Sequence, residues 1–252
     1  MQRRFSLAPL SHDCAVFLDI DGTLLNIAAT PDDVIVPPGL HVLLHALAAA
    51  EGGALALVSG RALADIDRLF GRGLAAAAEH GAILRDATGR ISRSIERDPA
   101  LAGLAAPLRA AVAVRPGTLL EEKEFGLVLH WRTAPEWNSE LTKIAESLAG
   151  PYPQLTLLSA HAALEIRQRG SDKASALSHF MRMPPFEGRM PVFVGDDLTD
   201  EPAIAWANAF GGRGLHVVRD FQNGVAGVHA WLETSLNQLK GRRDHVYSES
   251  GS

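Results

Sequence analysis

The sequence predicts an α/β protein whose doubly wound parallel sheet is interrupted by an inserted α+β cap domain. Uninterrupted apolar runs such as CAVFLDI (14–20) are typical of strands buried on both faces of a parallel sheet, and helical patterns alternate with these runs. Between residues 96 and 169 the order changes to helix–strand–strand and then repeats, which indicates an insertion with an antiparallel sheet. We therefore expect a core from residues 1–95 and 170–252 and a cap from residues 96–169.

In the first third of the chain, two helices are expected to separate three strands. Glycines at 52–53 and at 71 follow the two helical patterns, and glycine commonly ends a helix. The expected elements, in chain order, are a strand at 14–20, a helix at 39–52, a strand at 54–60, a helix at 61–71 and a strand at 74–81.

The insertion is expected to contain two helices and four strands, after which the alternation of the core resumes. Its helices begin near residue 99 and at residue 135, and each precedes two strand-like runs. These runs cover residues 117–125, 126–132, 154–160 and 162–169. The remaining core elements are a helix at 173–181, a strand at 190–197, a helix at 200–209, a strand at 214–219 and a helix around 224–240.

Composition narrows the class of protein. Of the 252 residues, 47% are hydrophobic and 21% are charged, as is ordinary for a globular protein with a full core. The net charge of −5 offers no basic face for nucleic acid, so an anionic small substrate would need local cations. The single cysteine, Cys14, has no partner for a disulfide in the sequence and lies in a core-like run. Neither a signal peptide nor a membrane span is predicted, and we expect a cytoplasmic protein.

Four polar motifs are expected where core strands end or core helices begin. The carboxyl ends of strands in an open parallel sheet meet at one edge, where ligands bind, so residues far apart in the chain can share one site. The motifs are Asp19-Ile20-Asp21-Gly22-Thr23, Ser59-Gly60-Arg61, Lys173 and Gly195-Asp196-Asp197.

The two aspartates of the first motif suggest a metal-dependent phosphate site. Asp19 and Asp21 are two positions apart, so their side chains point to the same side of an extended chain. Their carboxylates repel each other unless a cation intervenes, and Asp196 offers a third oxygen ligand. Oxygen ligands of this kind suit Mg²⁺. With Mg²⁺ and Lys173 nearby, one carboxylate could attack a phosphate while the other moves the proton.

The other motif residues can bind phosphate. Ser59 and the backbone amides at Gly60 and Arg61 are neutral donors at a helix start, while Gly22 allows close approach and the Thr23 hydroxyl can fix the turn. Each motif alone also has an ordinary explanation, as an Asp-Gly turn, a helix cap, acidic residues at a helix start or a solvated lysine. Their coincidence at one sheet edge favours the functional interpretation.

The motifs resemble those of the haloacid dehalogenase superfamily of phosphatases. DIDGTL (19–24), SGR (59–61), Lys173 and GDDLTDE (195–201) are similar to its four motifs in order and spacing. The resemblance implies a Rossmann-like core of this superfamily's type, with an aspartyl-phosphate intermediate. Ala174 departs from the pattern, because glycine usually follows the lysine in members with a sugar cap.

The same resemblance implies roles for individual residues. The implied catalytic residues are Asp19 as nucleophile, Asp21 as general acid/base, and Lys173. The implied phosphate-binding residues are Thr23, Ser59, Gly60 and Arg61, together with Lys173. The implied Mg²⁺ ligands are Asp19, the Asp21 carbonyl and Asp196, with Asp197 and Asp200 as additional or supporting ligands.

Within the superfamily the chain resembles the trehalose-6-phosphate phosphatases. The segments that carry this resemblance are DIDGTLLNIAATPDDVIVP (19–37), AAEHGA (77–82), EEKEFGLVLHWR (121–132) and GDDLTDE (195–201). It implies that the cap binds the sugar through Glu121, Lys123, Arg132 and Glu165. Such charged residues could equally form a solvated strand and turn, and His80 could contact substrate or be structural.

The expected activity is hydrolysis of trehalose 6-phosphate to trehalose and phosphate, in trehalose biosynthesis. A functional link to a trehalose-6-phosphate synthase is a possible partnership, with neither nucleic acid nor membrane involved. One alternative is another sugar-phosphate phosphatase of the superfamily, of the sucrose-phosphate or mannosylglycerate-phosphate type. The other alternative is a non-catalytic sugar-phosphate sensor, which the intact Asp19, Asp21, Lys173 and Asp196 disfavour.

Overall fold

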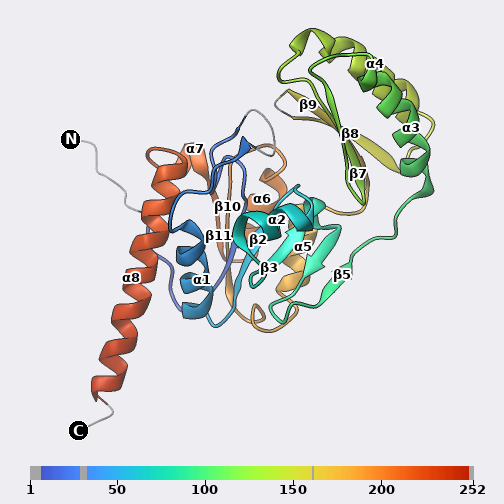
Figure 1. Cartoon of the computed structure of the whole chain (residues 1–252). Helices are drawn as coiled ribbons and strands as arrows, with labels where there is room; N and C mark the ends of the chain where they lie inside the picture. The colour runs from blue at the N-terminus through green and yellow to red at the C-terminus, as the bar shows by residue number, and fades with distance from the viewer. Residues whose placement is uncertain (1–6, 29–32, 161, 250–252) are drawn as a thin grey trace. The chain divides into compact units, whose positions relative to one another are not determined.

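The computed structural model describes residues 7–28, 33–160 and 162–249 (Figure 1). Contacts divide the chain into two compact units, with the boundaries of the second unit at Arg93–Ser171 and the first unit resuming at Asp172. The second unit is thus an insertion in the first. Its expected role as a cap remains a prediction. None of the helices in the described ranges has the length and apolar character needed to cross a membrane.

The first unit is built on a seven-stranded sheet in which the first strand of the chain lies at the centre. The five strands from β11 to β3 are parallel, and β4 runs antiparallel to β3. Strands β2 to β5 follow one another on one side of β1, and β10 and β11 lie on its other side, which makes the sheet doubly wound. Across the sheet the order is β11 (Arg213–His216), β10 (Met190–Gly195), β1 (Cys14–Leu18), β2 (Leu55–Val58), β3 (Ala75–Ala78), β4 (Ile83–Arg85) and β5 (Ile91–Arg93).

Helices cover this sheet, whose strands β1, β2 and β3 are buried along their whole length. On one face, Ala15 and Phe17 of β1 pack against side chains of α5 and α6, and the rings of Phe17 and Phe180 lie 6.0 Å apart. On α1 and α8, buried leucines such as Leu44 and Leu232 add to the core. The helices of this unit are α1 (Leu40–Ala50), α2 (Leu63–Phe70), α5 (Lys173–Phe180), α6 (Glu201–Ala209), α7 (Val217–Asp220) and α8 (Val225–Glu249).

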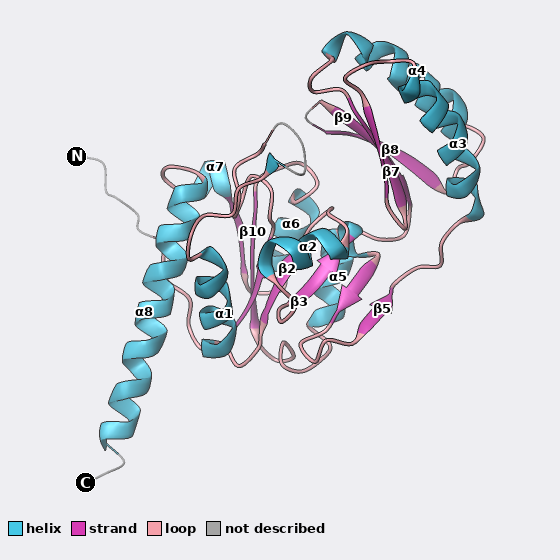
Figure 2. Ribbon diagram, viewed as in Figure 1, coloured by secondary structure: helices cyan, strands magenta, loops and turns pink. Residues whose placement is uncertain are grey.

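The second unit is an antiparallel four-stranded sheet covered on one face by two helices (Figure 2). Its core contains alternate strand residues such as Leu127, Leu129, Leu164 and Ile166, which pack with leucines and alanines of the helices. Because side chains alternate along a strand, the intervening residues lie on the face away from the helices. The strands, in order across the sheet, are β6 (Leu119–Glu122), β7 (Gly126–His130), β9 (Ala163–Gln168) and β8 (Leu155–Ala160), and the helices are α3 (Pro99–Ala113) and α4 (Asn138–Ala149).

This architecture confirms the predicted α/β fold class, but three features of the first unit differ from expectation. The short strands β4 and β5 were not expected, because runs of three residues carry too little pattern to be recognised. The strand expected at 214–219 ends at His216, since the Asp220 carboxylate accepts the His216 N–H at 2.7 Å and starts helix α7. The last helix continues beyond residue 240 to Glu249.

Candidate active site

The first motif begins where β1 ends. Asp19 directly follows the strand, and its N–H donates to the Val194 carbonyl of β10 at 3.0 Å, so the strand pairing places its side chain at the sheet edge. The chain then turns at Gly22, whose φ of +82° is a left-handed conformation that glycine adopts without strain. The Gly22 N–H closes the turn by donating to the Leu25 carbonyl at 2.7 Å. Strand and turn together aim both aspartates at the carboxyl edge.

Lys173 reaches this edge from the first turn of α5. A capping box fixes the start of the helix, because the Asp172 carboxylate accepts the Ser175 N–H and the Ser175 hydroxyl oxygen accepts the Asp172 N–H. Lys173 Nζ donates to Asp19 Oδ1 at 2.7 Å and to Asp200 Oδ1 at 2.5 Å. The structure therefore brings together three charged residues from distant parts of the chain.

These three charges are almost completely removed from water. The exposed fractions of Asp19, Lys173 and Asp200 are 4%, 4% and 0%. Burial raises the pKa of Asp19 above its usual range, and the Lys173 ammonium opposes this shift. Burial disfavours the charged form of Lys173, but the two carboxylates outweigh burial and raise its pKa. With both carboxyl groups ionised, the cluster would carry one excess negative charge, which a further cation would neutralise.

The acidic loop after β10 completes the cluster. Asp200 Oδ2 accepts the N–H groups of Asp196 and Asp197 at 2.9 and 3.2 Å, which folds the loop around a buried carboxylate. Burial, together with the neighbouring Asp197 and Asp200 carboxylates, raises the pKa of Asp196 to about 7. Oxygen atoms of Asp19, Asp196 and Asp200 lie within 4.8 Å of one another.

This donor set fits a divalent cation such as Mg²⁺. Its ligand atoms are hard carboxylate oxygens, and a cation bound between them would offset the repulsion that arises when these groups ionise. Asp200 already accepts hydrogen bonds on both oxygens, so its observed contacts are those of a supporting residue. Asp197 lies outside the cluster and is exposed, and its Oδ1 accepts the N–H and hydroxyl of Thr199, both at 2.8 Å.

The serine motif follows β2, the strand beside β1. Ser59 is buried, and its Oγ accepts the Arg61 N–H at 3.2 Å. The side chain of Arg61 forms a two-pronged ion pair with Asp21, with Nε to Oδ2 and Nη2 to Oδ1 both at 2.7 Å. Thr23 is fully buried, and its Oγ1 has no hydrogen-bond partner within the described residues. The predicted phosphate-binding residues thus lie on two adjacent loops.

A turn at Glu79–Gly81 supports the serine motif, and the sequence did not predict this role. Glu79 and His80 have left-handed φ values of 47° and 57°, which are unusual for residues other than glycine. Their N–H groups donate to the carbonyls of Arg61 and Ser59, both at 2.9 Å. A Cβ on Gly60 would lie 2.5 Å from His80 Nε2, so the imidazole packs directly on the motif. The only available signal was the segment AAEHGA.

Three of the four predicted sugar-binding residues, Glu121, Lys123 and Glu165, form a polar row in the second unit. Lys123 Nζ lies 3.1 Å from Glu165 Oε1 and 3.9 Å from Glu121 Oε1. His130, for which the sequence favoured a structural role over substrate contact, lies 2.9 Å from Glu121 Oε2. Burial alone would raise the pKa of Glu121, but His130 and Lys123 outweigh it and lower the pKa. Arg132 is half-buried and lies two residues after the end of β7.

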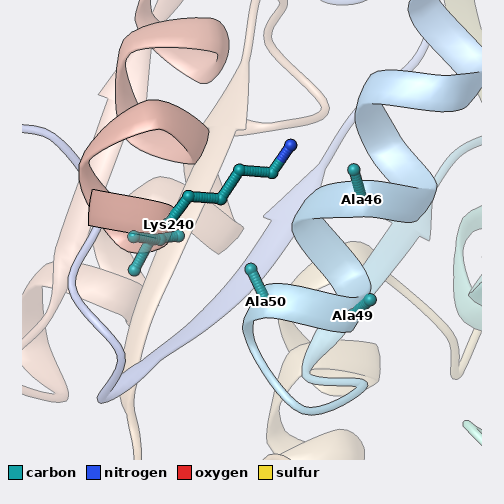
Figure 3. Close-up of a pocket in the computed structure, with 5 residues that line it drawn as sticks. Ala46, Ala49, Ala50 and Lys240 are labelled. Carbon is teal, nitrogen blue, oxygen red and sulfur yellow. The ribbon is translucent and has the colours of Figure 1, made fainter. Parts of the chain in front are cut away.

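The first unit also has a pocket between two helices. Ala46, Ala49 and Ala50 of α1 line it together with Leu239 and Lys240 of α8 (Figure 3). These are methyl groups, one leucine and one lysine, and they include neither a carboxylate nor a nucleophile. The acidic cluster at the end of β1 therefore remains the candidate active site.

The doubly wound fold, with aspartates and a lysine at the carboxyl edge of its parallel strands, is a haloacid dehalogenase-like fold. The fold is shared with a haloacid dehalogenase-like hydrolase from B. subtilis, at a TM-score of 0.57 and 14% identity over 87% of this chain and 99% of that chain. The trehalose-phosphatase family model matches residues 17–230. The chain belongs to the trehalose-phosphatase family and is a phosphoric monoester hydrolase.

Individual relatives agree with this assignment. A trehalose-6-phosphate phosphatase of Escherichia coli strain K12 is 36% identical over 95% of this chain and 93% of its own length. A probable trehalose-phosphate phosphatase of Sinorhizobium fredii is 40% identical over 84% of this chain and 81% of its own length. The C-terminal domain of a C. albicans trehalose-6-phosphate phosphatase shares the fold, with a TM-score of 0.72 and 20% identity over 92% and 93% of the two chains.

Proposed function

We propose that this chain is a Mg²⁺-dependent phosphatase that hydrolyses trehalose 6-phosphate to trehalose and phosphate through an aspartyl-phosphate intermediate. The observation that carries the proposal is the contact between Lys173 and Asp19 at the end of β1. A buried ammonium next to a carboxylate favours its ionised form, which is the form that can attack phosphorus. The names of the two bacterial relatives support trehalose 6-phosphate as the substrate.

In the first half of the reaction, an Asp19 oxygen forms a bond to phosphorus while the bond from phosphorus to the sugar oxygen breaks. Asp21 gives its proton to that oxygen, so the sugar leaves as an alcohol. In the second half, water attacks the same phosphorus, its proton passes to Asp21 and the Asp19–phosphorus bond breaks. Both aspartates return to their starting states, which makes the cycle catalytic.

The remaining core residues hold the phosphate and balance charge. The Ser59 hydroxyl, the Thr23 hydroxyl and the backbone amides near Gly60 are neutral donors for phosphate oxygens. Lys173 supplies one positive charge beside Asp19. Asp19, Asp196 and the Asp21 carbonyl would hold Mg²⁺, with Asp197 and Asp200 as supporting residues. When bound, the cation supplies charge that offsets the carboxylates and the phosphate.

We assign sugar recognition to the second unit, through Glu121, Lys123, Arg132 and Glu165. Lys123 and Glu165 already contact each other on the helix-free face of the sheet, and charged groups of this kind form strong hydrogen bonds with sugar hydroxyls. A site that provides several such groups penalises ligands that lack the matching hydroxyls. Placement in the cytoplasm and a functional link to a trehalose-6-phosphate synthase remain predictions.

The function is tested by phosphate release from a panel of sugar phosphates, with Mg²⁺ and with EDTA. The panel contains trehalose 6-phosphate, sucrose 6-phosphate, mannosylglycerate phosphate and glucose 6-phosphate. We expect a clear preference for trehalose 6-phosphate and loss of activity in EDTA. Asp19→Asn should reduce turnover to background, because an amide cannot act as the nucleophile, whereas Asp65→Asn on α2 serves as the matched control.

Four outcomes would contradict the proposal in different ways. Near-wild-type turnover by Asp19→Asn would overturn the nucleophile, and full activity in EDTA would overturn the metal. Equal rates on all four sugar phosphates would overturn the substrate and the sugar-binding roles. Tight binding of trehalose 6-phosphate by the wild-type protein in Mg²⁺ without turnover would instead support a sensor.

A further inference from the structure

The ion pair between Arg61 and Asp21 is a contact that phosphate binding alone does not explain. Two nitrogens of the guanidinium meet the two oxygens of one carboxylate, each at 2.7 Å. Such a two-pronged pair fixes the plane and the direction of the carboxylate, which a single-point contact does not. The Arg61 side chain is 9% exposed and the Asp21 side chain 36%, so the arginine is the more enclosed partner.

The backbone of Arg61 is held from several sides. Its N–H donates to Ser59 Oγ at 3.2 Å, and its carbonyl accepts the Glu79 N–H at 2.9 Å. The preceding residue, Gly60, lies directly beneath the His80 ring, which leaves no room for a Cβ there. The guanidinium is therefore presented from a fixed loop, while Asp21 lies beside the left-handed turn at Gly22. A fixed arginine that meets a more exposed carboxylate is suited to orient it.

We propose that the side chain of Arg61 is a positioning residue that acts through Asp21, and that it is not primarily a phosphate ligand. This inference rests on the proposed function, in which Asp21 carries the proton. The guanidinium holds the carboxyl group of Asp21 in the direction from which the protonated group gives its proton to the departing sugar oxygen and the resulting carboxylate later takes a proton from water. Misplacement by about 1 Å can cost a factor of about 100 in rate, so orientation of this group matters.

The proposal predicts different effects on two substrates, because their leaving groups differ in whether they must be protonated as they depart. A sugar alkoxide is a poor leaving group and must be protonated as its bond to phosphorus breaks. A p-nitrophenolate leaves without a proton, so the attack by Asp19 on p-nitrophenyl phosphate needs Asp21 only in the later attack by water. A residue that acts through Asp21 should therefore affect the first bond cleavage of the sugar substrate most. A residue that binds the phosphoryl group should affect both substrates equally, because they share that group.

The experiment compares the wild-type chain with Arg61→Ala and Arg61→Lys on trehalose 6-phosphate and on p-nitrophenyl phosphate. For Arg61→Ala we expect kcat on the sugar phosphate to fall about 10- to 100-fold, with KM and inhibition by inorganic phosphate changed less than about threefold. The first turnover of p-nitrophenyl phosphate, followed as a burst of p-nitrophenol, should change less than about threefold. Arg61→Lys keeps the charge without the planar fork and should recover only part of the loss. Arg68→Ala on α2 is the control.

A double-mutant cycle with Asp21→Asn gives the second readout. If Arg61 acts through Asp21, adding Arg61→Ala to Asp21→Asn should lower kcat on the sugar phosphate by less than about threefold further. The proposal would be overturned if the losses of kcat in the two single variants multiplied in the double variant. It would also be overturned if Arg61→Ala lost activity equally on both substrates, or if its KM and its inhibition constant for phosphate rose tenfold. Circular dichroism checks folding, and the Arg61→Lys cycle decides the question if Arg61→Ala does not fold. If the wild-type protein does not hydrolyse trehalose 6-phosphate, the proposed function is contradicted but the role of Arg61 is not. The double-mutant cycle can then be measured on whichever sugar phosphate the wild-type protein hydrolyses.

Discussion

At the residue scale, the acidic site depends on a close approach between two loops. A Cβ built on Gly22 would lie 1.9 Å from Asp196 Oδ2, so the carboxylate occupies the space that a side chain at residue 22 would need. The turn also holds Gly22 at a φ of +82°, which side-chain-bearing residues rarely adopt. Two separate physical demands therefore favour glycine at this position, and only one of them concerns the backbone.

Substitution of Gly22 by alanine separates these two demands when it is compared with Gly39→Ala. Gly39 has a φ of +84°, but a Cβ there meets no atom within 4 Å, so its substitution should cost only about 1–2 kcal/mol of unfolding free energy. Gly22→Ala should also displace Asp196, and we expect its phosphatase activity to fall at least about 100-fold. Denaturant unfolding and phosphate release measure the two effects. Similar activity in both variants would contradict the role of the close approach.

At the scale of elements, strand register builds the polar row of the second unit. Glu121 on β6 and Glu165 on β9 both lie opposite Val128 of β7, so they occupy one line across the sheet on the face away from the helices. Lys123 follows β6 and pairs with Glu165 at 3.1 Å. A shift of one residue in either pairing would turn these charges toward the apolar core. The helices therefore help to specify the row, by fixing which face is apolar.

Replacement of Lys123 by methionine tests whether this row binds sugar. The change keeps much of the side-chain length and removes the charge, and we expect KM for trehalose 6-phosphate to rise about 10- to 100-fold, as for loss of a charged hydrogen bond. The kcat for p-nitrophenyl phosphate should stay within about twofold. Lys143→Met, at an exposed position on α4, is the matched control. An unchanged KM in a folded Lys123→Met variant would contradict sugar binding by this lysine.

The same scale shows which elements a sequence can predict. The strands β1 and β2 were predictable because their apolar runs are bounded by helices and polar motifs. The strand β4 was not, because three residues after a left-handed turn carry no pattern of their own. Helix α7 begins within an expected strand because a local hydrogen bond from His216 to Asp220 outweighs strand propensity. Local polar contacts of this kind are invisible to hydrophobic patterning.

At the scale of the whole molecule, the parallel sheet gathers residues from both ends of the chain into one site. Lys173 and Asp19 are 154 positions apart and meet at 2.7 Å. Their common location followed from the rule that parallel strands end at one edge. The contact of Lys173 with Asp19 was expected, but the pairings of Lys173 with Asp200 and of Arg61 with Asp21 were not, because partner choice among neighbouring carboxylates depends on distances of a few ångströms.

The gathered charges link metal binding to pH and to the stability of the fold. Because the folded state raises the pKa of Asp196 to about 7, its proton stabilises the metal-free protein at low pH, and this contribution is lost as pH rises through 7. Mg²⁺ requires the ionised carboxylate and must displace that proton. The affinity for Mg²⁺ should therefore rise with pH over the range in which Asp196 loses its proton in the metal-free protein.

We expect the apparent Kd for Mg²⁺ to be about tenfold higher at pH 6 than at pH 8, because the ionised fraction of a group with a pKa near 7 changes by about that factor. Thermal unfolding at several Mg²⁺ concentrations measures this without reference to activity, and the increase in Tm at a fixed concentration should be larger at pH 8. Asp196→Asn should bind Mg²⁺ weakly and with little pH dependence. Equal affinities at the two pH values in the wild-type protein would show that Mg²⁺ does not compete with this proton, and would remove Asp196 from the proposed ligands.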